Sequence, residues 1–142
     1  MIAICAFSLV AAVGRWAYSK AESVYGTPSC SWPLRIHGNE TGGQDGLVRC
    51  YLQALANRDA VAMRAVATSL PATKITSIDF RHSGDARTGT ATAIFGQNPS
   101  DSTDAWAVIH FADGAVEDLG LINEMSMGGN DVWRITIGSA WN

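Results

Sequence analysis

The apolar positions of residues 45–56 recur at helical spacing. They lie on one side of a helix, and the set is Leu47, Val48, Tyr51, Leu52 and Leu55. This pattern predicts an amphipathic helix that ends near Ala56. Residues 57–59 interrupt it, and Asp59 is suited to cap a second short helix that stops before Pro71. We expect the two helices to share one buried side.

After Pro71 the pattern changes to an alternation of period two. Residues 74–82 and 87–95 are expected to form a hairpin that turns through Ser83-Gly84-Asp85. Residues 116–125 and 132–137 are expected to form later strands, each preceded by a glycine-containing turn.

Residues 105–111 differ from these strands because both of their faces are apolar. Trp106 and Val108 lie on one face, and Ile109 and Phe111 lie on the other. A strand of this kind is expected in the centre of a sheet. The predicted fold is α+β, with a helix pair packed on a curved antiparallel sheet of four to five strands.

An apolar segment precedes this pattern. Residues 2–13 carry no charge, and twelve residues match the apolar region of a signal peptide better than the roughly 18 to 20 of a membrane span. The positively charged start of a signal peptide is missing, however. We therefore expect residues 1–20 to be a signal peptide or a membrane anchor, with a buried helix of the domain as the alternative. Residues 21–43 lack a period and are expected to be a linker, followed by a domain over residues 44–142.

Composition and charge restrict the classes of function. The 142 residues are 47% hydrophobic and 16% charged, which fits a folded body rather than a disordered chain. The net charge is -3 and no basic run occurs, so nucleic acid is not an expected partner.

The chain has three cysteines, at positions 5, 30 and 50. If Cys5 is removed with a leader or lies in a membrane, Cys30 and Cys50 form one candidate disulfide, which would indicate an oxidising, extracytoplasmic compartment. Two free buried thiols in a cytosolic protein are the alternative, because the cysteine spacing matches no metal site.

Common catalytic and cofactor motifs are absent from the sequence, including phosphate-binding, dinucleotide-binding and zinc-protease signatures. His37, His82 and His110 lie far apart in different predicted elements, so a metal site is not expected. No cofactor is expected either.

Residues 46–63, from Gly46 through Asn57-Arg58-Asp59 to Met63, resemble the opening of nuclear-transport-factor-2-like (cystatin-like cone) domains. In that superfamily a helix ending near Asn or Gly, followed by Asp, leads into a second helix. Asp131-Val-Trp-Arg-Ile is similar to the last strand of these domains. The likeness covers about residues 45–137. Together with the leader and linker, it resembles the small membrane-associated or exported accessory proteins of the superfamily.

The resemblance also implies an enzymatic alternative, because some members place an Asp or His inside the cone to move a proton. Candidate catalytic residues here are His110, Asp104, Asp79 and His82. Trp106 would then shape the pocket. The structural alternative treats these polar groups as strand-end or solvated residues, and Trp106 and Trp133 as core aromatics.

The expected function is that of a non-catalytic interaction domain, exported or tethered to a membrane, and an accessory subunit of a larger membrane assembly. Its expected partner is a protein, in a membrane complex or a homodimer, and its contact with the membrane is the N-terminal segment. The alternatives are a small-molecule-binding or isomerase/cyclase-type enzyme that uses the cone pocket, and a secreted ligand-binding module.

Overall fold

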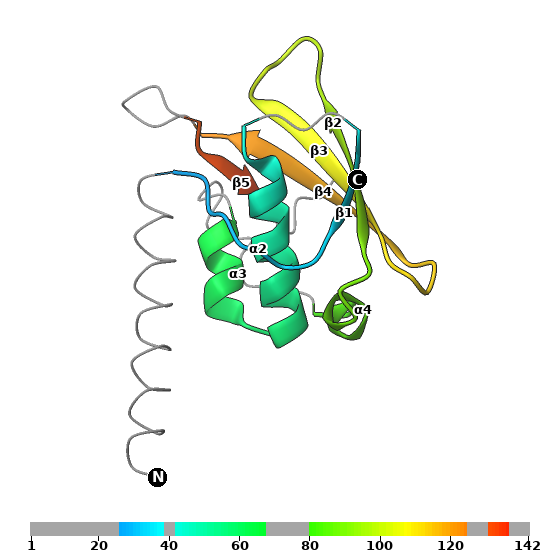
Figure 1. The fold of residues 1–142 in the computed structure, drawn as a ribbon. Coiled ribbons are helices and arrows are strands. Elements are labelled where there is room, and N and C mark those ends of the chain that lie inside the picture. Colours follow the sequence, from blue (N-terminus) through cyan, green and yellow to red (C-terminus); the bar gives the residue numbers. More distant parts are fainter. Residues whose placement is uncertain (1–25, 39–41, 68–79, 125–130, 137–142) are drawn as a thin grey trace.

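Helices pack on one side of an open five-stranded mixed sheet in the computed structural model, which describes residues 26–38, 42–67, 80–124 and 131–136 (Figure 1). The helices are α2 (Gln44–Asn57), α3 (Ala60–Val66) and α4 (Ser83–Arg87). The strands are β1 (Arg35–Gly38), β2 (Thr92–Gln97), β3 (Asp104–His110), β4 (Val116–Asn123) and β5 (Trp133–Ile135). The α+β class predicted from the sequence is therefore confirmed.

The strands lie in the order β1-β2-β3-β4-β5, so β3 is the central strand, as its two apolar faces predicted. The pairs from β2 to β5 are antiparallel, whereas β1 runs parallel to β2. The prediction of a wholly antiparallel sheet is corrected by this first strand. Strand β1 lies within residues 21–43, which had been expected to be a linker. With four residues it is too short to show the alternation of period two that identifies a strand in a sequence. Leu34 and Ile36 nevertheless pack against the core, while Arg35 and His37 stay exposed.

The helix pair follows the sequence prediction closely. Helix α2 ends where Arg58 adopts the left-handed conformation, with its N–H bonded to the Leu55 carbonyl at 3.2 Å and the Asp59 N–H bonded to the Ala54 carbonyl at 2.9 Å. The Asp59 carboxylate then accepts a hydrogen bond from the Ala62 N–H at 3.1 Å and caps α3. Backbone groups at the end of α2 and at the start of α3 therefore both find hydrogen-bond partners within one short turn.

The core lies between α2 and the sheet. Leu47, Leu52 and Leu55 of α2 are buried, and they belong to the same apolar cluster as Ile109 and Leu121 of the sheet. Met63 and Val66 of α3 extend this cluster. The predicted packing of a helix pair on the sheet is thus confirmed.

The predicted hairpin through residues 83–85 is wrong, because these residues begin helix α4. The Ser83 N–H donates to the Phe80 carbonyl at 3.0 Å, and Ala86 is buried in the core cluster. A short polar segment with a glycine suits a turn and a helix equally well, and here the burial of Ala86 selects the helix. Residues 80–82 are not a strand, and residues 74–79 of the expected strand lie outside the described residues.

Residues 26–34 form a strap that crosses the helices from β5 to β1 (Figure 1). At one end the Thr27 hydroxyl accepts from the Trp133 N–H at 2.9 Å, and near the other the Trp32 carbonyl accepts from the Arg49 guanidinium at 2.8 Å. Ser29 lies so close to α2 that a side chain at Gly46 would meet its hydroxyl at 2.5 Å. The strap is therefore part of the folded unit.

A disulfide joins Cys30 of the strap to Cys50 of α2, as the cysteine count had predicted. It is consistent with an extracytoplasmic location, because disulfides persist in oxidising compartments. None of the helices within the described residues is long and apolar enough to cross a membrane. The apolar segment of residues 1–20 lies outside those residues.

We predict that reduction of the Cys30–Cys50 bond lowers the free energy of unfolding by about 3 kcal/mol, because the bond closes a loop of 20 residues in the unfolded chain. Urea unfolding followed by circular dichroism, with and without reductant, measures this difference. In the double variant Cys30→Ser/Cys50→Ser the reductant should have no effect. A wild-type curve that does not move after both thiols have been freed would contradict the prediction.

We also predict that Arg58→Gly raises the free energy of unfolding by about 0.5 to 1 kcal/mol. Arg58 has a φ of 51°, a conformation that strains residues with a Cβ but not glycine. The matched control is Asn57→Gly one residue earlier, where the backbone is still helical and glycine should destabilise by a similar amount. Thermal melting of both variants tests the pair, and equal shifts in the same direction would refute it.

Candidate functional site

The structure does not bring Asp104 and His110 together. They occupy the first and last positions of β3, and six residue steps of an extended strand separate them by about 20 Å. Both side chains lie on the sheet face opposite α2, since they alternate with the buried Ala105, Ala107 and Ile109. The Asp104 carboxylate accepts a hydrogen bond from the Asn98 side-chain amide at 3.2 Å.

His82 lies at the start of α4. Its ring stacks on Phe111 with a centroid distance of 5.2 Å, and its Nδ1 lies 3.2 Å from Asp85 Oδ2. These contacts fix the entry into α4 against the end of β3. Asp79, the remaining catalytic candidate, lies outside the described residues.

The two tryptophans predicted to be core aromatics have different environments. Trp133 is 2% exposed and belongs to the core cluster, as expected. Trp106 is 44% exposed, so its assignment to the core was wrong. The reason is that the helices cover only one face of β3, and Trp106 is on the other.

An acidic residue that the sequence analysis did not single out lies on the covered face of the sheet. Glu117 of β4 accepts a hydrogen bond from the Tyr51 hydroxyl of α2. Glu117 lies on the same face of β4 as the buried Leu119 and Leu121. An acidic residue at a position where the alternation of the strand predicts an apolar one could have identified it from the sequence. This pair connects α2 to the sheet within the core.

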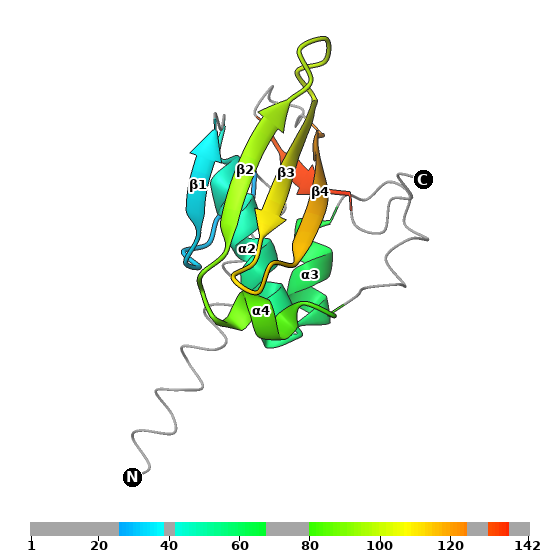
Figure 2. The same ribbon diagram turned by 90° about the vertical axis from the view of Figure 1, so that its right-hand side faces the viewer.

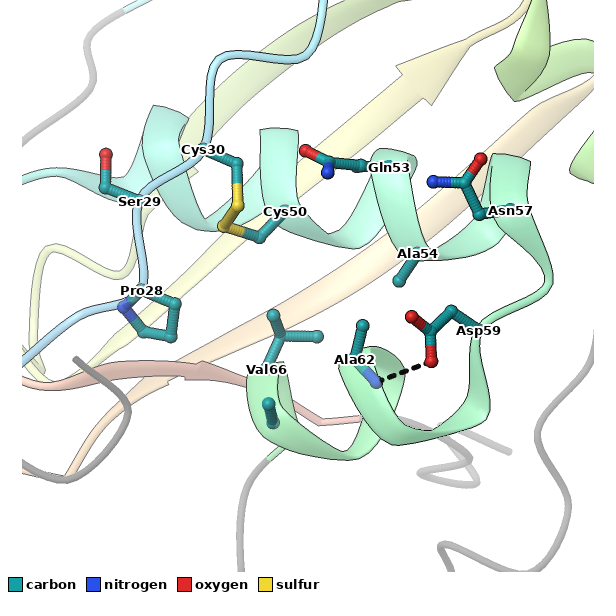
Figure 3. A pocket seen from close by; sticks show the side chains of 11 residues that line it. Pro28, Ser29, Cys30, Cys50, Gln53, Ala54, Asn57, Asp59, Ala62 and Val66 are labelled. Carbon is teal, nitrogen blue, oxygen red and sulfur yellow. Dashed lines mark hydrogen bonds between the residues drawn. A yellow bond between two sulfur atoms is a disulfide. The ribbon is translucent and has the colours of Figure 1, made fainter. Parts of the chain in front are cut away.

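A shallow groove of about 80 Å³ that opens to solvent lies between α2, α3 and the strap (Figure 3). Its polar lining includes the amides of Gln53 and Asn57, and the Cys30–Cys50 disulfide forms part of its wall. The Asp59 carboxylate also lines it but is engaged as the cap of α3. These residues can bind a small polar group. Asp59 is the one ionisable side chain in the lining, so the groove does not hold the two titrating groups that acid–base catalysis would use. Among the described residues, no group of three or more His, Cys, Asp or Glu is placed to hold a metal ion.

The opposite side of the sheet, which we call the outer face, is the larger candidate surface. It consists of the outward-pointing residues of β2, β3 and β4, and no described helix lies in front of these strands (Figure 2). Cross-strand pairing arranges the residues in four rows: Thr92–His110–Val116, Ile94–Val108–Asp118, Gly96–Trp106–Gly120 and Asp104–Ile122. Ile94, Trp106 and Val116 are 42%, 44% and 49% exposed.

Glycines flank Trp106 on both sides. A Cβ at Gly96 would lie 2.2 Å from two carbons of the indole, so the ring lies across β2 at that point. Gly120 is its partner on β4. The missing side chain of Gly96 allows the indole to lie down on β2 instead of standing away from the sheet.

Charged residues lie at the edges of the outer face and, at Asp118, within it. Arg35 and His37 of β1 lie beside Thr92 and Ile94, whereas Asp104 occupies the opposite end of the sheet. Arg134 of β5 pairs with Ile122, and its guanidinium donates to the Gly26 carbonyl at 3.2 Å. Burial lowers the pKa of Arg134, and the charge of Glu124 partly opposes that effect.

No family model, no curated protein and no solved structure matches this chain.

Proposed function

We propose that this chain is a non-catalytic interaction domain, exported or tethered to a membrane, that binds a protein partner through its outer face. The observation that carries the proposal is the exposure of three large apolar side chains on this face, Ile94, Trp106 and Val116. We propose further that it is a cone-type domain of the nuclear-transport-factor-2-like superfamily. The turn from Asn57 to the Asp59 cap supports this assignment, because it is the feature on which the resemblance rests.

The outer face differs from an ordinary solvated sheet face. An antiparallel sheet with one face in water normally alternates apolar and polar residues along each strand. Here the solvent side of the three middle strands carries a central apolar group, namely Ile94, Trp106, Val108, Val116 and Ile122. Tryptophan is enriched among the residues that dominate binding energy at protein interfaces. A surface that exposes a tryptophan and several aliphatic side chains, with Asp118 among them and other charges at its edge, fits a protein partner.

The proposed location is supported by the disulfide and by the arrangement of the chain. The strap that carries Cys30 begins beside β5, where the Thr27 hydroxyl accepts from the Trp133 N–H, and it follows the apolar segment that we propose to be a leader or membrane anchor.

The enzymatic alternative has less support from the described residues. Proton transfer next to a carbonyl requires a base, a group that tunes it and a donor for the oxyanion in one place. Asp104 and His110 are about 20 Å apart along β3, and His82 is engaged with Phe111 and Asp85. The interaction function needs no such cluster.

We predict that a photoreactive amino acid in place of Ile94 cross-links the chain to a specific protein in native cells. Ile94 lies next to Trp106 on the outer face and is 42% exposed. The matched control is the same amino acid in place of Val61, an apolar residue of α3 that is 60% exposed on the helix side. Introducing Trp106→Ser should abolish the cross-link at position 94. Thermal melting should show that the variant still folds, because Trp106 lies outside the core cluster.

The adduct's mass distinguishes a second copy of the 15.1 kDa chain from a different protein. Cross-linking at position 61 but not at position 94 would overturn the proposal, as would an adduct at position 94 that persists in the folded Trp106→Ser variant.

We predict that the domain is located outside the cytoplasm. A reporter enzyme that folds only in an oxidising compartment, fused to the C-terminus of the full chain, should be active in the native host. A fusion lacking residues 1–20 should be inactive, since those residues are proposed to direct export. Equal activity of the two fusions, or cysteines that react with an alkylating reagent in unreduced cells, would contradict the location.

A further inference from the structure

We infer that the partner presents an arginine to the outer face, where its guanidinium stacks on the Trp106 indole and donates to the Asp104 carboxylate. This inference rests on the proposed function, because it names the chemistry of the side chain that the outer face binds. Two features of the face support it, namely the orientation of the Trp106 ring and the distribution of charge around that ring.

The Trp106 indole offers one flat side to a ligand. Its other side lies over Gly96, where the missing side chain lets the ring rest on β2. The residue is 44% exposed, so the solvent side of the ring is accessible. The faces of an aromatic ring are electron-rich and attract cations, and among aromatic side chains the indole attracts them most strongly. An indole held flat on a sheet in this way is suited to a planar cation.

A carboxylate lies beside this ring. Asp104 precedes Trp106 by two residues on the same face of β3, which places their Cβ atoms about 7 Å apart. The Asp104 Oδ2 atom accepts from the side-chain amide of Asn98, which follows directly after β2. This hydrogen bond draws the carboxylate toward β2, the strand on which the indole lies. The second oxygen of Asp104 has no donor among the described residues.

The charges of the outer face favour a cation over an anion next to Trp106. Asp104 lies two residues from it on β3, whereas His110 lies four residues away at the other end of the strand. Arg35 of β1 is in the same row as His110, at that far end. Asp118 of β4 adds a second carboxylate, since it pairs with the residue two positions after Trp106. A basic group of a partner is therefore attracted here, and an acidic group is repelled.

Arginine fits this arrangement better than lysine. The guanidinium is planar and carries its N–H donors in the plane, so it can stack on a ring and donate sideways to a carboxylate at the same time. The ammonium of lysine is a compact, strongly hydrated charge with no flat surface. A neutral planar group could cover the indole but would form no ion pair with Asp104.

The test uses the segment of the partner that the cross-linker at position 94 captures. Position 94 is on β2, two residues from Gly96 and therefore next to the indole. Mass spectrometry of the adduct identifies the segment. Synthetic peptides of that sequence are then compared in which each arginine in turn is kept, replaced by citrulline or replaced by lysine. Citrulline keeps the planar shape but has no charge, whereas lysine keeps the charge but is not planar.

We expect the full-length chain, held in a mild detergent because of its apolar segment, to bind the arginine peptide most tightly. Citrulline at one position should weaken binding by about 30-fold, because it removes both the cation–π contact and the ion pair. Lysine at the same position should weaken binding by about fivefold, because only the stacking is lost. Fluorescence anisotropy of labelled peptides measures the dissociation constants.

Variants of this chain assign the two contacts. Asp104→Asn keeps an acceptor for the Asn98 amide but removes the charge, so it should weaken the arginine peptide by about tenfold and the citrulline peptide hardly at all. Trp106→Leu should remove the preference for arginine over lysine. The control Asp45→Asn removes a carboxylate on α2, on the covered side, and should leave every dissociation constant unchanged. Thermal melting establishes that each variant is folded.

Equal binding of the arginine and citrulline peptides would overturn the inference, as would a folded Asp104→Asn variant that preserves the difference between them. If the free peptides bind too weakly to measure, the arginine is changed to glutamine in the partner itself, and an undiminished adduct at position 94 would be decisive against the inference. A captured segment without arginine also overturns it but leaves the proposed function standing. If position 94 captures no protein, the proposed function fails too.

Discussion

The core depends on burial of one face of the sheet against α2. A five-stranded sheet has two sides, and the described helices lie on one of them (Figure 2). The inner residues of β3, which are Ala105, Ala107 and Ile109, are almost fully buried beneath α2. Since the same strand carries Trp106 and Val108 on its other side, packing on one face leaves apolar groups exposed on the other. The face that stabilises the fold and the face on which we propose binding are therefore opposite faces of the same strand.

The strap completes the covered side. It connects the β5 edge to β1 across the two helices, and the Cys30–Cys50 bond fixes its middle to α2. Beyond the disulfide, toward β1, the Trp32 carbonyl accepts from the Arg49 guanidinium and the Trp32 indole N–H donates to the Ala86 carbonyl. A four-residue strand at the edge of a sheet is marginal by itself, so a covalent attachment a few residues earlier in the chain reduces the entropy lost when β1 pairs.

Two glycines have specific functions in this arrangement. Gly46 lets the strap contact the backbone of α2, on the covered side. Gly96 lets Trp106 lie on the outer face, on the exposed side. In both places a Cβ would collide with a neighbouring residue that is distant in sequence. The close approach therefore follows from tertiary structure and cannot be recognised from the local pattern.

The sequence by itself determined the elements with a sustained period. The helix over residues 45–56, its Asp59-capped successor, the central strand and the Cys30–Cys50 pair each follow from residues close in the pattern or from a simple count. Tertiary structure alone decided the short elements. Residues 35–38 became a strand and residues 83–87 a helix because burial of Ile36 and Ala86 outweighed weak local preferences. It also decided which apolar face of β3 is covered. Alternation identifies two faces, but only the position of α2 makes Ile109 a core residue and leaves Trp106 at the surface.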